Sequence, residues 1–157
     1  MSNDQTPPDS TSRIMHNLHQ AGRRWTRVDA LFAELCTEFQ ADFAAAPTCE
    51  ALIDSDLVSL IVRSILGFVT EGVESAASMA FRCEPCGLRD GRLVITIDRV
   101  GAPRLADSGL NLFATGALAE TGQLIQSCDG FASASPTEHG ERLALVIKTP
   151  TRLVNED

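Results

Sequence analysis

Residues 89–97 read RDGRLVITI, and this stretch marks a change in the spacing of the apolar side chains. Before it, apolar residues recur every three or four positions, which is the period of a helix face. Residues 93–97 follow the two-residue period of a strand instead. The Asp90-Gly91 pair suits a tight turn, so the stretch predicts a hairpin that joins a strand at 78–83 to the strand at 93–97. Helices followed by antiparallel strands indicate an α+β protein.

A first helix is predicted well before this hairpin. Its apolar side chains recur at three- and four-residue spacing from Val28 to Phe43, which places them on one face. Thr26 is expected to cap the start of the helix, and Asp29 stands favourably in its first turn. Pro47 is expected to end it.

A second helix is predicted after a short apolar strand at 51–53. Asp54 and Ser55 are expected to start this helix, and its apolar residues fall on a single inward face. The inward positions are Leu57, Leu60, Ile61, Ile65, Phe68 and Val69.

The chain after the hairpin is expected to add one more helix and the closing strands. A glycine-bearing turn leads into a third helix at 110–120. Segments 123–128 and 131–135 flank an Asp129-Gly130 turn, and 143–148 is expected to be the last long strand. Together these elements predict a two-layer α/β sandwich, in which helices cover one face of a mixed, mostly antiparallel sheet.

The chain has the length of one domain with short tails. At 157 residues, 44% of them apolar, it can bury a sizeable core. Residues 1–12 are polar and contain prolines, so a disordered tail is expected there. Residues 13–24 are interpreted as a helical lead-in, 25–150 as the domain and 151–157 as a C-terminal tail.

Charge and composition restrict the partners. The net charge of −8 and the sequence pI of about 4.8 disfavour nucleic-acid binding. The most apolar stretch, 57–69, is too short and too interrupted to cross a membrane. Five cysteines without a signal segment favour a reducing cytoplasm. Arg23, Arg24 and Arg27 beside Trp25 form the main basic cluster, either a solvated helix start or a docking patch.

The segment Cys83-Glu84-Pro85-Cys86 has the spacing of a redox or zinc pair. The remaining cysteines are scattered, and no second pair of this spacing completes a set of four zinc ligands. A thioredoxin-like pair would open a helix, whereas this one ends a strand. We therefore expect Cys83 and Cys86 to be incidental thiols, and we expect no metal site.

Four segments between residues 57 and 150 read, in order, LVSLIVRSILGFVTEGVESA, GRLVITIDRVGAP, SGLNLFATGALAETGQL and HGERLALVIKTP. In this order they resemble the N-box helix, the two glycine boxes and the last strand of the histidine-kinase catalytic domain. That domain belongs to the GHKL ATPase superfamily, and the chain is most similar to its short-lid, HWE-like subfamily. The likeness runs from about Arg24 to Pro150 and implies a Bergerat-like ATPase fold.

The resemblance also implies that the metal site of the family is lost. In the family, the N-box helix supplies a polar base and, one turn later, an asparagine that coordinates Mg²⁺. Ser64 and Phe68 match these positions. A phenyl ring offers no oxygen to Mg²⁺, and the nearby Glu71 would repel phosphates. The resemblance thus implies neither a catalytic residue nor a metal ligand here.

The glycine boxes imply a remnant of the nucleotide site. Asp98 matches the acid that reads adenine, and Gly101 matches one of the two glycines that follow it. Gly109 and Asn111 take the place of Gly-x-Gly, so an amide side chain stands where backbone should approach phosphate. Glu141 replaces the threonine of the final Gly-Thr pair. We expect no bound cofactor, or only weak ATP or ADP binding, at this remnant.

The missing ligands imply a catalytically silent domain that is retained as a protein-binding regulator in bacterial two-component-type signalling. Trp25, Arg24 and Arg27 are the expected contact residues. The resemblance implies as partner a second copy in a homodimer, the helical bundle of a histidine kinase, or a receiver domain. The alternative is a diverged kinase domain that binds ATP weakly and phosphorylates in trans. Phe68 separates the two, because an active relative should carry an oxygen or amide ligand there.

Overall fold

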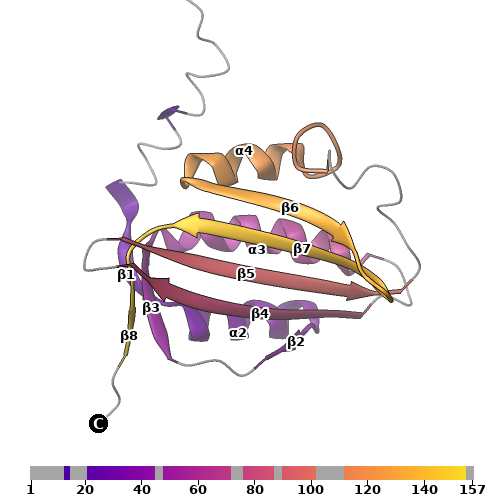
Figure 1. The fold of residues 1–157 in the computed structure, drawn as a ribbon, viewed down its shortest axis with the longest axis horizontal. Coiled ribbons are helices and arrows are strands. Elements are labelled where there is room, and N and C mark those ends of the chain that lie inside the picture. The colour runs from indigo at the N-terminus through magenta and orange to yellow at the C-terminus, as the bar shows by residue number, and fades with distance from the viewer. Residues whose placement is uncertain are drawn as a thin grey trace, which may run out of the picture.

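The computed structural model describes residues 13–14, 21–44, 48–71, 76–86, 90–101 and 112–154. These residues form two β-sheets packed with helices (Figure 1). In chain order the elements are β1 (Arg24–Arg27), α2 (Val28–Phe39), β2 (Asp42–Phe43), β3 (Cys49–Ile53), α3 (Ser55–Val69), β4 (Ala76–Pro85), β5 (Gly91–Val100), α4 (Ala119–Ser127), β6 (Gly130–Pro136), β7 (Gly140–Lys148) and β8 (Thr151–Leu153).

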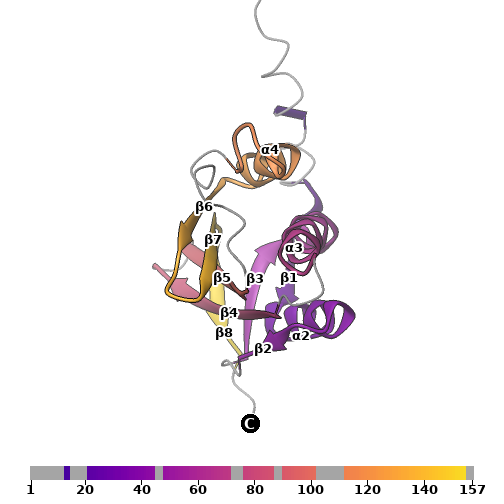
Figure 2. The same ribbon diagram turned by 90° about the vertical axis from the view of Figure 1, so that its right-hand side faces the viewer.

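The larger sheet has the strand order β2-β4-β5-β7-β6, and its strands are antiparallel except for the β2–β4 pair. Helices α2 and α3 lie over one face of this sheet, and α4 lies beside β6 (Figure 2). A smaller antiparallel sheet has the order β1-β3-β8. The predicted α+β sandwich with a mixed, mostly antiparallel sheet is confirmed.

The core lies between the larger sheet and the helices. It contains alternate residues of β5 and β7 together with the inward face of α3. Each such side chain, when fully buried, contributes about 1.5–3 kcal/mol. The fully or almost fully buried members include Leu93, Ile95, Ile97, Leu143, Leu145, Ile147, Ile61 and Ile65. The alternation in the opening stretch therefore does mark a strand with one core face.

Helix α3 begins as predicted. The Asp54 carboxylate accepts hydrogen bonds from the backbone N–H groups of Asp56 (3.1 Å) and Leu57 (3.3 Å), which caps the helix. Leu60 was predicted to face inward but is 50% exposed. Phe68 is only partly buried and packs against the edge of the core.

Helix α2 differs from its prediction at both ends. Thr26 does not cap it, because residues 24–27 form strand β1, and the Thr26 hydroxyl donates to the Arg24 carbonyl. The helix also ends earlier than predicted, at Phe39, where Gln40 turns the backbone at a φ of 57°. Phe43 belongs to β2 and stacks on Phe81.

Two segments near the C-terminus have structures that were not predicted. Helix α4 begins at Ala119 rather than at 110, and it includes most of segment 123–128, which was placed among the closing strands. The helix packs tightly on the turn before it, since a Cβ on Gly122 would overlap the Phe113 carbonyl. Thr151–Leu153, assigned to the C-terminal tail, form β8 and pair with β3. Residues 1–12 lie outside the described residues.

Candidate functional site

Strands β5 and β7 carry two ion pairs at one end of the larger sheet. Arg99 lies opposite Glu141 in the register, and the neighbouring Asp98 lies opposite Arg142. Because successive side chains of a strand point to opposite faces, the two pairs lie on opposite faces of the sheet. Arg99 and Glu141 share the parity of the core residues and are buried, whereas Asp98 and Arg142 lie on the outer face.

The Arg99–Glu141 pair fills the core side of this end of the sheet. The Arg99 Nη1 donates to the Glu141 Oε2 at 2.9 Å, and the two side chains are only 6% and 3% exposed. The packing next to this pair requires glycine at position 140, because a Cβ there would overlap the Arg99 carbonyl. The buried charges therefore neutralise each other within the protein.

Asp98, the expected adenine-reading acid, forms a two-point ion pair with Arg142. The Asp98 carboxylate oxygens accept from Nε at 2.7 Å and from Nη2 at 3.0 Å, and this hydrogen bonding raises the pKa of Arg142. Gly101 has a φ of 148° and donates its N–H to the His139 carbonyl, a backbone shape that favours glycine. Gly109 and Asn111 lie outside the described residues. The structure thus places Asp98 on the face turned away from α3, and so does not bring it together with Phe68.

A hollow of about 730 Å³ lies between α3 and the start of α4. Ser64, Phe68 and Glu71 line one side of it, and residues 116–121 line the other. The Ser64 hydroxyl donates to the Leu60 carbonyl within its own helix. Two lining residues, Glu71 and Glu120, are acidic, and none of the described lining residues is basic. Such a lining is unfavourable for phosphate groups.

Trp25 lies on the outer side of the smaller sheet. The Arg152 guanidinium stacks over its ring at 3.9 Å from the centroid, and the Arg152 Nε donates to Glu50 at 2.7 Å. Trp25 itself remains 38% exposed. Sequence reasoning missed Arg152 and Glu50, because the strand that carries Arg152 was assigned to the tail.

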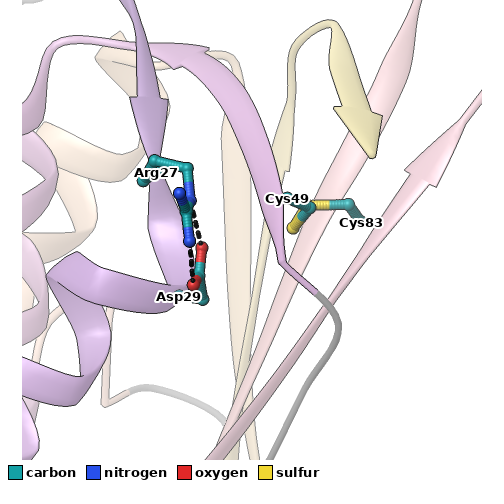
Figure 3. A network of polar contacts seen from close by, with 4 residues as sticks. All are labelled: Arg27, Asp29, Cys49 and Cys83. Carbon is teal, nitrogen blue, oxygen red and sulfur yellow. Dashed lines mark hydrogen bonds and ion pairs between the residues drawn. A yellow bond between two sulfur atoms is a disulfide. The ribbon is translucent and has the colours of Figure 1, made fainter. Parts of the chain in front are cut away.

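The two expected basic neighbours of Trp25 are engaged locally. Arg27 makes a two-point ion pair with Asp29 at 3.0 and 3.1 Å (Figure 3), and this hydrogen bonding lowers the pKa of Asp29. The Arg24 Nη1 donates to the Arg23 carbonyl at 2.8 Å. Residues 24–27 therefore form a strand rather than a solvated helix start, and Arg27 is ion-paired with Asp29.

The cysteines are arranged differently from the expectation. Cys83 is not an incidental thiol, because it forms a disulfide with Cys49 that joins β3 to β4 (Figure 3). Cys86 is a free, exposed thiol. It cannot pair with Cys83 in this fold, since β4 stays extended through Pro85 and three residues of a strand span about 10 Å, beyond disulfide reach.

The two remaining cysteines are buried free thiols. Burial raises the pKa of Cys36 to about 11 and that of Cys128 to about 12. Among the described residues there is no group of three or more side chains suited to hold a metal ion. The described helices also include none that is long and apolar enough to span a membrane.

Comparison with known proteins places the fold. No family model matches the sequence, and no curated protein matches it. Among solved structures, the ATP-binding domain of PrrB from Mycobacterium tuberculosis superimposes with a TM-score of 0.67 at 19% identity, over 82% of this chain and 98% of that one. The mycobacterial sensor histidine kinase MprB superimposes with a TM-score of 0.57 at 14% identity, over 82% of this chain and all of that one.

A third match is the blue-light-activated histidine kinase EL346 from Erythrobacter litoralis, with a TM-score of 0.53 at 12% identity. It covers 76% of this chain, which spans 40% of that longer protein. The chain has the GHKL-type fold of histidine-kinase ATP-binding domains. The resemblance seen in the sequence is thus confirmed at the level of the fold.

Proposed function

We propose that this chain is a catalytically silent domain with the histidine-kinase ATPase fold, and that it acts as a protein-binding regulator in bacterial two-component-type signalling. One observation carries the proposal. The hollow between α3 and α4 has Phe68 where the family resemblance expects a metal-binding asparagine, and its charged lining residues are Glu71 and Glu120. Mg²⁺ would lack that oxygen ligand, and the phosphates would meet two carboxylates.

The buried Arg99–Glu141 pair supports the same proposal. The resemblance matches Glu141 to a threonine that assists adenine binding in the family. Here Glu141 is held by Arg99 at 2.9 Å and is almost fully buried. A base bound at this place would have to separate two buried charges, which is strongly unfavourable.

The proposed partner is a protein, and its contact surface includes Trp25. Partly exposed aromatic residues beside arginines are typical anchors of protein interfaces. Trp25 and Arg152 form such a pair on the smaller sheet. A second copy, the helical bundle of a histidine kinase and a receiver domain are the candidate partners. We place this activity in the cytoplasm, where disulfides such as Cys49–Cys83 are rare. We propose no nucleic-acid or membrane partner.

Calorimetric titration of the full chain with ATP and ADP, each with and without Mg²⁺, tests catalytic silence. We expect no Mg²⁺-dependent binding at nucleotide concentrations up to the millimolar range. The PrrB ATP-binding domain under the same conditions serves as a comparison. The Phe68→Asn variant should not recover binding, because it leaves the carboxylates and the Arg99–Glu141 pair in place. Micromolar, Mg²⁺-dependent ATP binding by the wild type would instead favour a kinase that phosphorylates in trans.

Analytical ultracentrifugation tests the Trp25 surface. The wild type, Trp25→Ala and Arg152→Glu would be compared alone and with a histidine-kinase bundle or a receiver domain. Leu60→Ser is the matched control, because Leu60 is also an exposed apolar residue but lies on α3. We expect an association that both Trp25-surface variants lose and the control keeps. A wild type that stays monomeric and binds neither protein would contradict this part of the proposal.

A further inference from the structure

Strand β6 forms one edge of the larger sheet. Its sequence, GFASASP at Gly130–Pro136, contains no charged residue, whereas 22% of the residues of the whole chain are charged. Among the described strands β6 pairs only with β7, so its other side has no strand partner in that part of the chain. Protein edge strands are usually protected by charges, prolines or bulges. Of these protections β6 has Pro136 at its end, and helix α4 covers part of the edge.

The register identifies the backbone groups on the open side. The Lys148 N–H donates to the Asp129 carbonyl, and the Thr137 N–H donates to the Gly140 carbonyl. These bonds show that odd-numbered residues of β6 bond to β7, so even-numbered residues direct their N–H and C=O groups outward. In the described part of the chain, Ala132 and Ala134 have no other hydrogen-bond partner.

Helix α4 makes this edge one wall of a groove. A hollow of about 240 Å³ lies between the helix and β6, with Phe131 at its rim. Figures 1 and 2 both show α4 beside β6. Ala134 is almost covered, so the open part of the edge is centred on Ala132. None of the described lining residues is charged; they are Phe113, Ala114, Gly122, Ile125, Gln126, Gly130, Phe131 and Ala132.

We propose that this groove binds an extended, uncharged peptide segment of a partner protein, which adds to β6 as a further strand. The backbone of the segment would pair with the outward groups of Ala132 and Gly130, and its small or apolar side chains would lie against Phe131 and Phe113. A second copy of the chain is the competing occupant, and the experiment distinguishes it from a partner segment. The inference rests on the proposed function only in taking the partner to be a protein.

The test uses a displayed library of random heptapeptides that is selected on the full chain. The affinities of the selected peptides for the wild type, Ala132→Pro and Ser133→Ala are then measured by fluorescence polarisation. Ala132→Pro removes an outward N–H and leaves the β7 hydrogen bonds intact, as proline on an edge strand can. Ser133→Ala is the matched control, because Ser133 bonds to β7 and lies outside the groove lining. We expect Ala132→Pro to weaken binding about tenfold, and the control to leave it unchanged.

Hydrogen exchange of the wild type with bound peptide provides a readout that does not depend on a variant folding. The Ala132 amide should exchange fast in the free protein and slowly in the complex. Three results would overturn the proposal: no enriched peptide, equal affinity for a folded Ala132→Pro variant, or unchanged exchange at Ala132. A wild-type dimer that Ala132→Pro dissociates would identify a second copy as the occupant, and also overturn it. ATP binding would refute catalytic silence but would change none of these results.

Discussion

Breaking the buried Arg99–Glu141 pair should strongly destabilise the fold. Both side chains are almost fully buried, and their Nη1 and Oε2 atoms are 2.9 Å apart. Glu141→Leu leaves the Arg99 charge in the core without its counter-charge, and Arg99→Met does the reverse. Removing one partner of such a pair costs about 3–5 kcal/mol, because the remaining charge stays desolvated. We expect a loss of this size in the free energy of unfolding for each single variant.

A variant with both residues replaced distinguishes the effect of an unpaired buried charge from the effect of lost packing. Arg99→Met with Glu141→Leu removes both charges and keeps most of the apolar volume. Replacing both members of a buried pair is often neutral or stabilising. The double variant should therefore be much more stable than either single variant. The Asp98–Arg142 pair is the matched control, since it joins the same two strands on the exposed face. Single and double variants of Asp98 and Arg142 should show a far smaller coupling free energy, because water screens that exposed pair.

Urea unfolding at neutral pH, followed by circular dichroism, would give the free energies for both cycles. The free energies can be compared only if the unfolding free energy of every variant falls with urea concentration at the same slope. The reasoning would be refuted if the single variants at the buried pair lost less than about 1 kcal/mol of unfolding free energy. A double variant as unstable as the sum of its singles would refute it as well.

Three further predictions concern the smaller sheet and the cysteines. Because hydrogen bonding by Arg27 lowers the folded-state pKa of Asp29, Asp29→Asn should be less stable than wild type at neutral pH. That difference should persist down to the ordinary aspartate pKa and vanish as the pH falls through the lowered value, as urea unfolding at several pH values would show. In native protein with its disulfide intact, iodoacetamide should label Cys86 and spare the two buried free thiols, as mass spectrometry would show. Reducing the disulfide, whose cysteines are 34 residues apart, should lower the stability by about 3–4 kcal/mol in the chain-entropy estimate; an unchanged melting temperature would contradict this.

Local sequence signals predicted the parts of the fold that local physics decides. The Asp54 cap, the alternation along β5 and the apolar face of α3 depend on residues that are neighbours in the chain. Strands β1 and β8 were missed because they are stabilised by pairing with β3, and β8 joins it across about a hundred residues. Short strands of this kind carry little periodicity of their own. Helix α4 was misplaced because a short apolar run does not distinguish strand from helix.

When a family motif is matched to a strand, an error of one residue assigns the functional side chain to the wrong face of the sheet. Matching by motif selected Asp98, whereas the alternation of β5 places Arg99 on the face that α3 covers. A shift of one position along a strand exchanges the two faces of the sheet. The counter-ion Glu141 could not be assigned from sequence, because its pairing depends on the β5–β7 register. Leu93, Ile95 and Ile97 alternate toward the core. Continuing this alternation by two residues would have placed Arg99 on the core face.

The energy of the Arg99–Glu141 pair also bears on ligand binding. A site that binds nucleotide keeps polar groups whose partners are supplied by the ligand. Here the two buried side chains at the end of the sheet form an ion pair with each other. A nucleotide that used Glu141 would have to separate it from Arg99 and leave a buried charge unpaired, which costs about 3–5 kcal/mol. Since each 1.4 kcal/mol is a factor of ten, this weakens affinity by about two to three and a half orders of magnitude. The Arg99–Glu141 pair should therefore oppose any nucleotide binding that uses Glu141.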